Sequence, residues 1–374
     1  MIKLDTVLIK VASRCNINCK YCYVYNMGDN GWQNMPAQLS VEAAKSIAEN
    51  LNTLYQIQQR PFSVILHGGE PLLLGRNKLK SILEILHRFL PSDCEIGIQS
   101  NGILITNEIL DFCYETKTTI SVSLDGPREI NDKFRVAHDG SGTFNKIIKG
   151  IEILKNHRES AFLYSGILAV VNPNSDPFEV YNFLKTLRPP SINFLYRDGN
   201  YVNLPFGKSS VNSTEYGEWF SKLLEIYLND PKPLRIKFLD DLIKLILAGE
   251  GSNKELGLTE HGVLVIDSDG SIAKNDTLKS SFDGADRFNQ DWSVFTHKLD
   301  DILKTKEFLE YHLSQHPTSQ ICRECPDLYI CGGGLALHRW HPDNSYDNPS
   351  VYCADQKLII KKVRTKLEEF QSLI

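Results

Sequence analysis

Three cysteines near the start of the chain have the types and spacing of a metal site. They lie in the run Cys15-Asn-Ile-Asn-Cys19-Lys-Tyr-Cys22, which separates them by three residues and then by two. Three thiolates with no fourth cysteine or histidine nearby do not close a tetrahedral zinc site. They suit a [4Fe–4S] cluster in which one iron has no protein ligand and is open to a substrate or cofactor. A zinc ion with a fourth ligand from a distant part of the chain is the alternative.

A second group near the other end contains four cysteines: Cys322, Cys325, Cys331 and Cys353. Four thiolates complete either a structural zinc site or a [4Fe–4S] cluster with no open iron, and the spacing alone favours zinc. Clustered cysteines in a chain of 374 residues indicate metal ligation in a reducing compartment rather than disulfides. The remaining two, Cys94 and Cys113, stand alone, and we expect both to be small buried residues.

Short polar segments follow three of the predicted strands. They are His67-Gly68-Gly69-Glu70-Pro71, Gln99-Ser100-Asn101-Gly102 and Ser121-Val122-Ser123-Leu124-Asp125-Gly126-Pro127. Glycine lets a backbone approach a ligand closely, and the carboxylate of Glu70 is available to an ammonium group. Each segment alone is more typical of a turn. Because barrel active sites lie where the strands end, their repetition at the rim that holds the first cysteine group predicts a functional site.

The elements that must position these residues alternate between strand and helix. The predicted strands are short and rich in valine and isoleucine, and they cover Thr6–Val11, Phe62–Leu66, Glu95–Gln99, Thr119–Leu124, Phe162–Val170 and Ile192–Leu195. Apolar stripes predict helices between them, one over Val41–Leu54 behind an N-cap at Ser40 and another over Phe144–Leu154. Six strand–helix units predict an α/β fold, a partial (β/α)6 barrel of the TIM type with a parallel sheet.

The pattern of the chain divides it into three predicted domains. Residues 1–200 form the barrel, and residues 201–305 form a bridging region with a looser pattern. A hairpin over Val263–Ala273 in that region is expected on the substrate side, because Ser268-Asp269-Gly270 separates two apolar runs. Residues 306–374 form a small C-terminal domain that contains the second cysteine group.

Composition excludes several classes of function. The formal net charge is −5 with no run of like charges, which argues against a broad nucleic-acid surface. No stretch approaches the about 18 uninterrupted apolar residues of a membrane helix. Asp5 and Lys10 interrupt the apolar start, so it does not resemble a signal peptide. We therefore expect a cytoplasmic protein with neither nucleic acid nor membrane as a partner.

The ordered set CNINCKYC, HGGEP, QSNG and SLDGP resembles the radical S-adenosylmethionine (SAM) enzymes over residues 1–200. The resemblance implies that Cys15, Cys19 and Cys22 hold a [4Fe–4S] cluster whose open iron chelates the amino and carboxylate groups of SAM. Reductive cleavage of SAM would give methionine and a 5′-deoxyadenosyl radical that abstracts a substrate hydrogen. An electron donor such as flavodoxin or ferredoxin is implied as a partner.

The same resemblance implies which residues contact SAM. Gly68, Gly69 and Glu70 would receive the amino group of SAM. Ser123 and Arg135 would lie near its ribose and carboxylate, and Tyr21 near its adenine, although Arg135 alternatively is a surface cation. For Gln99 and Asn101, contact with SAM and capping of their own loop are equally consistent with the sequence.

The run CRECPDLYICGGG around Cys322, Cys325 and Cys331 resembles the C-terminal extension called SPASM, found in peptide-modifying radical SAM enzymes. Many such extensions hold two auxiliary clusters, but here Leu335 and Asn275 stand where the pattern has cysteines. The departures all fall on one auxiliary cluster, and the four cysteines of the other have matching spacing. We therefore expect two [4Fe–4S] clusters, one that binds SAM and one auxiliary.

Asp276 is the candidate catalytic base. In sulfatase-maturing relatives an aspartate at the equivalent place is the proposed base in the substrate pocket. A carboxylate there could take the proton released when a substrate radical is oxidised. The alternative is an aspartate that only caps a helix.

The segments CKYCYVYNMGDN, LYRDGNY and CGGGLALHRWHP resemble a subfamily that matures ribosomally synthesised precursor peptides. Its members form cyclophane crosslinks that join an aromatic ring carbon to the β-carbon of a residue two positions later. The resemblance thus implies a peptide-modifying oxidoreductase with a precursor peptide as substrate. Two alternatives remain open: another peptide maturase, such as one that forms formylglycine in a sulfatase, and a zinc-stabilised binding scaffold with degenerate radical machinery.

Overall fold

The computed structural model describes residues 2–249, 251 and 256–372, which form two compact units. The first unit comprises Met1–Leu124, Asn131–Ile167 and His261–His312, and the second comprises Asp125–Ile130, Leu168–Glu260 and Leu313–Ile374. Each unit is therefore assembled from segments that are distant in the sequence. In the part of the chain that the structure describes, we find no helix with the length and apolar character needed to cross a bilayer.

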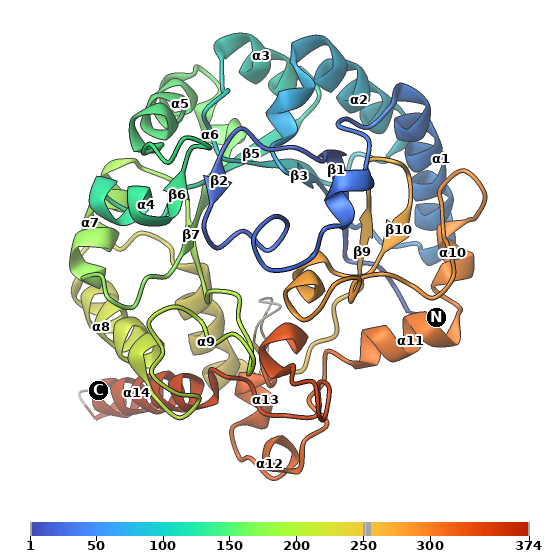
Figure 1. Ribbon diagram of the computed structural model, residues 1–374. Helices are drawn as coiled ribbons and strands as arrows, with labels where there is room; N and C mark the ends of the chain where they lie inside the picture. The colour runs from blue at the N-terminus through green and yellow to red at the C-terminus, as the bar shows by residue number, and fades with distance from the viewer. Residues whose placement is uncertain (1, 250, 252–255, 373–374) are drawn as a thin grey trace. The chain divides into compact units, whose positions relative to one another are not determined.

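The first unit is built on a curved, mainly parallel sheet. Its strands lie in the order β10-β9-β1-β3-β4-β5-β7, and Figure 1 labels these strands except β4. Their bounds are Thr6–Ala12 for β1, Ser63–Gly68 for β3, Ile96–Ser100 for β4, Thr118–Ser123 for β5, Tyr164–Val170 for β7, Val263–Ile266 for β9 and Ile272–Ala273 for β10. The pairs β1–β3, β3–β4, β4–β5 and β1–β9 are parallel. This arrangement confirms the predicted α/β partial barrel.

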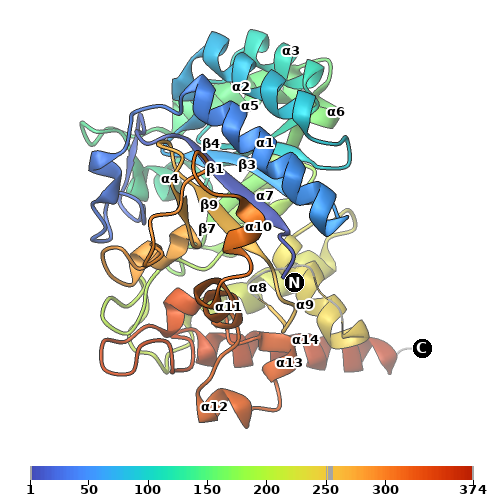
Figure 2. The same cartoon turned by 90° about the vertical axis from the view of Figure 1, so that its right-hand side faces the viewer.

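Helices cover the outer face of this sheet (Figures 1 and 2). They are α1 (Val41–Gln58), α2 (Arg76–Phe89), α3 (Asn107–Glu115) and α5 (Phe144–Asn156). The predicted N-cap is confirmed, because the Ser40 hydroxyl accepts a hydrogen bond from the Ala43 amide at 3.0 Å. One face of β1 is fully buried, with Val7, Ile9 and Val11 no more than 1% exposed, and on the other face Lys10 and Ala12 are 4% and 0% exposed. Burial of both faces at the end of the strand is typical of parallel sheets covered by helices.

Several predicted strand boundaries differ from the observed ones by one or two residues, and the start of β7 differs by two. Residues Ser160–Leu163 form the short helix α6, so β7 begins at Tyr164 rather than at Phe162. The ring of Phe162 packs edge-on against Tyr114 of α3, with a centroid distance of 5.8 Å. This tertiary contact outweighs the β-propensity of the segment. Cys94 and Cys113 are buried as expected, at 5% and 0% exposure.

The predicted hairpin exists as β9 and β10, which are antiparallel to each other. Its first strand also pairs in parallel with β1, from Thr6 opposite Val263 to Ile9 opposite Ile266. The hairpin is thus part of the barrel sheet. Next to it, the 3-10 helix η3 (Asp276–Ser280) begins with Asn275 as its N-cap, whose side chain accepts a hydrogen bond from the Thr277 amide at 3.1 Å.

The second unit surrounds a cluster of aromatic side chains. It contains the end of β7, its neighbour β8 (Ile192–Leu195), and the helices α8 (Glu215–Asn229), α9 (Lys237–Ala248) and α14 (Cys353–Gln371), which lie together in both views (Figures 1 and 2). The rings of Tyr196, Phe220, Phe238 and Tyr352 lie 4.4–5.7 Å from their neighbours. Such aromatic pairs add to the energy gained from burial alone.

A buried ion pair fixes the start of α14 in this unit. The Lys208 ammonium lies 2.5 Å from the Asp355 carboxylate, and both side chains are 0% exposed. Lys208 also donates to the Ser213 carbonyl at 2.7 Å, and Asp355 accepts from the Gly217 amide at 2.7 Å. Because Asp355 is only two residues after Cys353, this pair also fixes the position of that cysteine.

Replacing Lys208 by methionine should leave Asp355 as a buried, uncompensated charge. We expect the free energy of unfolding to fall by about 3–5 kcal/mol, measured by urea denaturation of the anaerobically purified protein. Lys306→Met is the matched control, because Lys306 is 89% exposed in its pair with Glu310 and should cost about 1 kcal/mol or less. Equal stability of the two variants would show that the Lys208–Asp355 pair does not hold this unit together.

Candidate functional site

The first cysteine group lies in the loop that follows β1. Within it, β2 (Asn18–Cys19) pairs with β6 (Arg135–Val136), so that Cys19 lies opposite Arg135. Burial raises the pKa of the Cys15 thiol to about 12 and that of Cys22 to about 11. Free thiols in this loop would stay protonated at neutral pH, and a bound metal is what would hold them as thiolates. The donor set therefore fits a thiolate-ligated cluster.

Two glycines after β3 bring the backbone against this loop. The Gly69 amide donates to the Ala12 carbonyl at 2.7 Å, and the Glu70 amide donates to the Arg14 carbonyl at 3.0 Å. A Cβ atom on Gly68 would lie 2.1 Å from the Ala12 carbonyl oxygen, and one on Gly69 would lie 2.2 Å from that of Arg14. No side chain fits at either position, because the two backbone segments are already in contact.

Glu70 lies just after β3, at the same rim. Its side chain is buried, and its carboxylate accepts from the Ser100 hydroxyl and the Asn101 amide at 2.8 Å and from the Leu72 amide at 3.1 Å. Burial raises its pKa, which these hydrogen bonds partly offset. Glu70 thus connects the ends of β3 and β4.

The other predicted SAM contacts form two groups beside the cysteines. In one, the Asn101 amide group donates to Asn16 Oδ1 at 2.7 Å and lies 3.8 Å from Cys15 Sγ. In the other, Arg135 donates to the Tyr21 hydroxyl at 2.8 Å. Arg135 is only 7% exposed, so it is not a surface cation.

Gln99 and Ser123 lie at the ends of the neighbouring strands β4 and β5. The Gln99 amide group donates to the Ser123 hydroxyl at 2.8 Å. The sequence did not indicate His138, whose Nε2 lies 2.9 Å from the Cys15 carbonyl oxygen.

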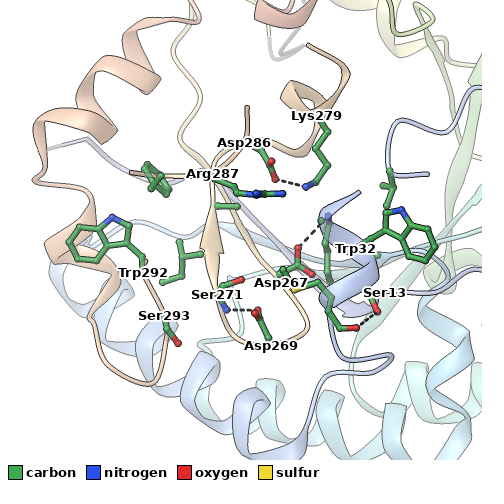
Figure 3. Close-up of a pocket in the computed structure, with 18 of the residues that line it drawn as sticks. Ser13, Trp32, Asp267, Asp269, Ser271, Lys279, Asp286, Arg287, Trp292 and Ser293 are labelled. Atoms are coloured by element: carbon green, nitrogen blue, oxygen red, sulfur yellow. Dashed lines mark hydrogen bonds and ion pairs between the residues drawn. The ribbon is translucent and has the colours of Figure 1, made fainter. Parts of the chain in front are cut away.

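A cavity of about 360 Å³ lies in the first unit and reaches Gly68 and Gly69. Figure 3 shows Trp32 and Trp292 in its lining, and the aromatic side chain of Phe288 also lines it. Its charged lining includes Lys10, Asp267, Lys279, Asp286 and Arg287. Concave sites of this size with aromatic walls and a few polar groups are typical of ligand pockets.

Lys10 joins two carboxylates beside this cavity. Its ammonium lies 2.9 Å from Asp276 Oδ2 and 3.5 Å from Asp267 Oδ2. Burial alone would lower the pKa of Lys10, but the charges of Asp276 and Asp267 raise it well above the usual range. Burial raises the pKa of Asp276, and the charge of Lys10 partly offsets this. The helix cap expected as the alternative role of Asp276 belongs to Asn275.

A second ion-pair group lies beside the first. The Lys279 ammonium is 2.7 Å from Asp286 Oδ2 and 3.3 Å from Asp29 Oδ1. Sequence reasoning missed Lys10, Lys279 and Asp286. For Lys10 a signal existed, since a lysine inside an otherwise apolar buried strand requires a partner.

In the second unit, the four later cysteines line one small hollow. Cys322 lies in α12 (Gln320–Arg323), Cys331 ends α13 (Leu328–Cys331), Cys353 begins α14, and Cys325 lies between the first two. Burial raises the pKa of Cys331 to about 12, and neighbouring thiols add to this. The thiols therefore meet at one place, as a shared metal centre requires.

A zinc ion would need four thiolates within about 2.3 Å of one point. Among the described residues, no group of three or more cysteine, histidine, aspartate or glutamate side chains is placed so that it could hold a metal ion. A [4Fe–4S] cluster is larger than a zinc ion and is likewise held by four cysteine thiolates. Leu335 and Asn275 offer no thiol for a further cluster.

The sequence of this chain is similar to those of known proteins. Residues 9–184 match the model of the Radical SAM superfamily. The chain is 24% identical over 377 residues to a cysteine-type anaerobic sulfatase-maturating enzyme of Clostridium novyi, covering 97% of this chain and 96% of the relative.

Two solved structures share the fold. The structure of native anSMEcpe with bound AdoMet has a TM-score of 0.82 at 21% identity and covers 99% of this chain and 100% of that one. SuiB of Streptococcus suis bound to its precursor peptide SuiA has a TM-score of 0.64 at 15% identity, covering 92% of this chain and 74% of SuiB.

Gly69→Ala tests whether the close backbone contact positions the first cysteine loop. The new methyl group would collide with the Arg14 carbonyl and the Tyr25 hydroxyl, both 2.2 Å away. We expect SAM affinity of the anaerobically reconstituted protein to fall at least tenfold, measured by equilibrium binding.

Gly140→Ala is the control for the general effect of adding a methyl group to glycine. It has no atom within 4 Å of the added Cβ, and it should cost only the about 1–2 kcal/mol of its left-handed backbone. Wild-type SAM affinity in Gly69→Ala would show that the loop does not depend on this contact.

Proposed function

Because the chain contains a radical SAM domain over residues 9–184, we propose that this peptide-modifying enzyme matures a precursor peptide by forming a cyclophane crosslink. The crosslink would join an aromatic ring carbon to the β-carbon of a nearby residue. The observation that carries the proposal is the cavity beside Gly68 and Gly69, which combines aromatic walls with two lysine-bound carboxylates, Asp267 and Asp286. The resemblance of the whole chain to cyclophane-forming maturases supports the same assignment.

The cofactors are a [4Fe–4S] cluster with SAM and an auxiliary [4Fe–4S] cluster. When bound, the first cluster and SAM supply a 5′-deoxyadenosyl radical that removes a hydrogen atom from the substrate. We assign Cys15, Cys19 and Cys22 as the ligands of that cluster. We assign Cys322, Cys325, Cys331 and Cys353 as the ligands of the auxiliary cluster.

The residues of the rim bind and orient SAM in this proposal. Gly68 and Gly69 leave backbone exposed to the ligand, and Glu70 attracts its amino group. Arg135 and Ser123 face its carboxylate and ribose, and Tyr21, held by Arg135, lies near its adenine. Gln99 and Asn101 orient Ser123 and the Cys15 side of the loop.

The cavity then holds the reacting part of the peptide. Trp32, Phe288 and Trp292 offer faces and edges against which an aromatic substrate ring can pack. A crosslink also requires the ring to lose a proton. We assign this role to the carboxylates that Lys10 holds, Asp267 and Asp276.

Partners follow from this chemistry. The substrate is a precursor peptide, and the solved structure of SuiB with its precursor SuiA supports a peptide as ligand of this fold. A flavodoxin or ferredoxin would supply the electron that cleaves SAM.

A second candidate function is the maturation of a sulfatase by oxidising cysteine or serine to formylglycine. The similarity to anaerobic sulfatase-maturating enzymes along nearly the whole chain supports it. Against it stand Asn275 and Leu335, which leave one auxiliary ligand set rather than two.

Mass spectrometry of reaction products separates the two candidates. The anaerobically reconstituted enzyme would receive SAM, a reductant and two probes. One is a pool of peptides with an aromatic residue two positions before a varied residue, and the other is a sulfatase-derived peptide with its target cysteine. We expect a product in the pool that has lost two hydrogens, resists fragmentation between the joined residues and does not react with a hydrazide.

Cys15→Ala is the control and should abolish the product together with 5′-deoxyadenosine. An aldehyde on the sulfatase peptide with no crosslink in the pool would establish the second candidate and contradict the first.

A further inference from the structure

Lys10 occupies a position where a charge is costly. It lies in β1 between Ile9 and Val11, is 4% exposed, and forms part of the cavity wall. A buried ammonium is stable only when opposite charges surround it. What those charges do beyond neutralising Lys10 depends on which of them the substrate can reach.

The two carboxylates differ in this respect. Asp267 directly follows β9, whose last residue Ile266 pairs with Ile9, so Asp267 lies level with Lys10 on the adjacent strand. Asp267 lines the cavity, as Figure 3 shows, whereas Asp276 is 1% exposed and does not contribute to the lining. Lys10 therefore has one partner that faces the cavity and one that lies behind it.

We propose that Asp267 is the catalytic residue that accepts the substrate proton, that Lys10 positions it, and that Asp276 is the buried counterion of Lys10. This assignment rests on the proposed function of the same site. It deepens that function by choosing between the two carboxylates. The ammonium of Lys10, 3.5 Å from Asp267 Oδ2, holds the carboxylate in place.

The crosslink forms by bond formation followed by loss of the ring hydrogen. The β-carbon, after losing its hydrogen atom, bonds to a ring carbon that still carries its own hydrogen. Breaking that C–H bond restores the aromatic ring and releases one proton and one electron. The proton goes to an oxygen of Asp267, which becomes a carboxylic acid, and the electron goes to an oxidised iron–sulfur cluster as one-electron acceptor.

Several charged or titratable groups surround Asp267. Lys10 lies between it and Asp276. His67, the neighbour of Lys10 on β3, is neutral at neutral pH because burial lowers its pKa to about 4. The charged lining also includes the pair of Lys279 with Asp286, the exposed Arg287, and the carboxylates of Asp269 and Asp291.

The expected effect of each variant follows from these neighbours. Product formation needs the carboxylate of Asp267 to accept a proton. Lys10→Met removes the ammonium that holds this carboxylate in place, so the product yield should fall. Asp276→Asn changes a group that lies on the other side of Lys10 and does not line the cavity, so its effect should be smaller.

The test compares SAM cleavage and product yield among variants, on the peptide that the wild-type enzyme converts. We expect Asp267→Asn to keep SAM cleavage within a few-fold of wild type and to lose about a hundredfold in product per 5′-deoxyadenosine, the usual scale of a general base. Asp276→Asn should lose less than tenfold, and Lys10→Arg should restore most of what Lys10→Met loses. Asp301→Asn, an exposed carboxylate on α10 (Leu299–Ile302), is the control and should match wild type.

Wild-type product yield in Asp267→Asn, or loss confined to Asp276→Asn, would overturn the proposal. An aldehyde product from the wild-type enzyme would refute the crosslinking function and leave the comparison of variants readable on that product. The two failures are therefore distinguishable.

Discussion

The buried ammonium of Lys10 in strand β1 is the constraint on which the site depends. A charge inside a parallel sheet is tolerated only with opposite charges at close range. Here they come from the hairpin β9–β10 and from η3, through Asp267 and Asp276. Strand β9 pairs with β1, so the same strand that leads into the cysteine loop also receives the element that carries the carboxylates. Strand β1 and the hairpin β9–β10 at this edge of the barrel sheet therefore also contribute residues to the wall of the cavity.

On the other side of β1, strand β3 makes an equally close contact. Gly68 and Gly69 allow its end to reach the carbonyl oxygens of Ala12 and Arg14, where no side chain would fit. The carboxylate of Glu70 then links this strand end to β4 by accepting hydrogen bonds from Ser100 and Asn101. Backbone contacts and a buried carboxylate thus position the loop of Cys15, and its neighbouring strands fix where a ligand of the cluster can lie. Rigid strand ends of this kind are suited to hold reacting groups in place.

Much of this could be predicted from the sequence because the signals are local. Strand and helix periodicity located the barrel elements, and spacing identified both cysteine groups. The start of β7 was wrong because Phe162 packs on Tyr114, a contact that no local pattern encodes. The pairing of β9 with β1 joins segments that are far apart in the chain, so no local sequence pattern indicates the partners of Lys10. Asn275, rather than Asp276, caps η3, and only the structure distinguishes these neighbours.

We propose that one chain holds two [4Fe–4S] clusters, one open to SAM and one closed by four thiolates. Iron, sulfide and zinc analysis of the anaerobically reconstituted protein is the decisive measurement. Two clusters require about eight irons per chain with matching sulfide and no zinc. About four irons with one zinc would contradict the auxiliary cluster, and zinc without iron would contradict the radical mechanism altogether.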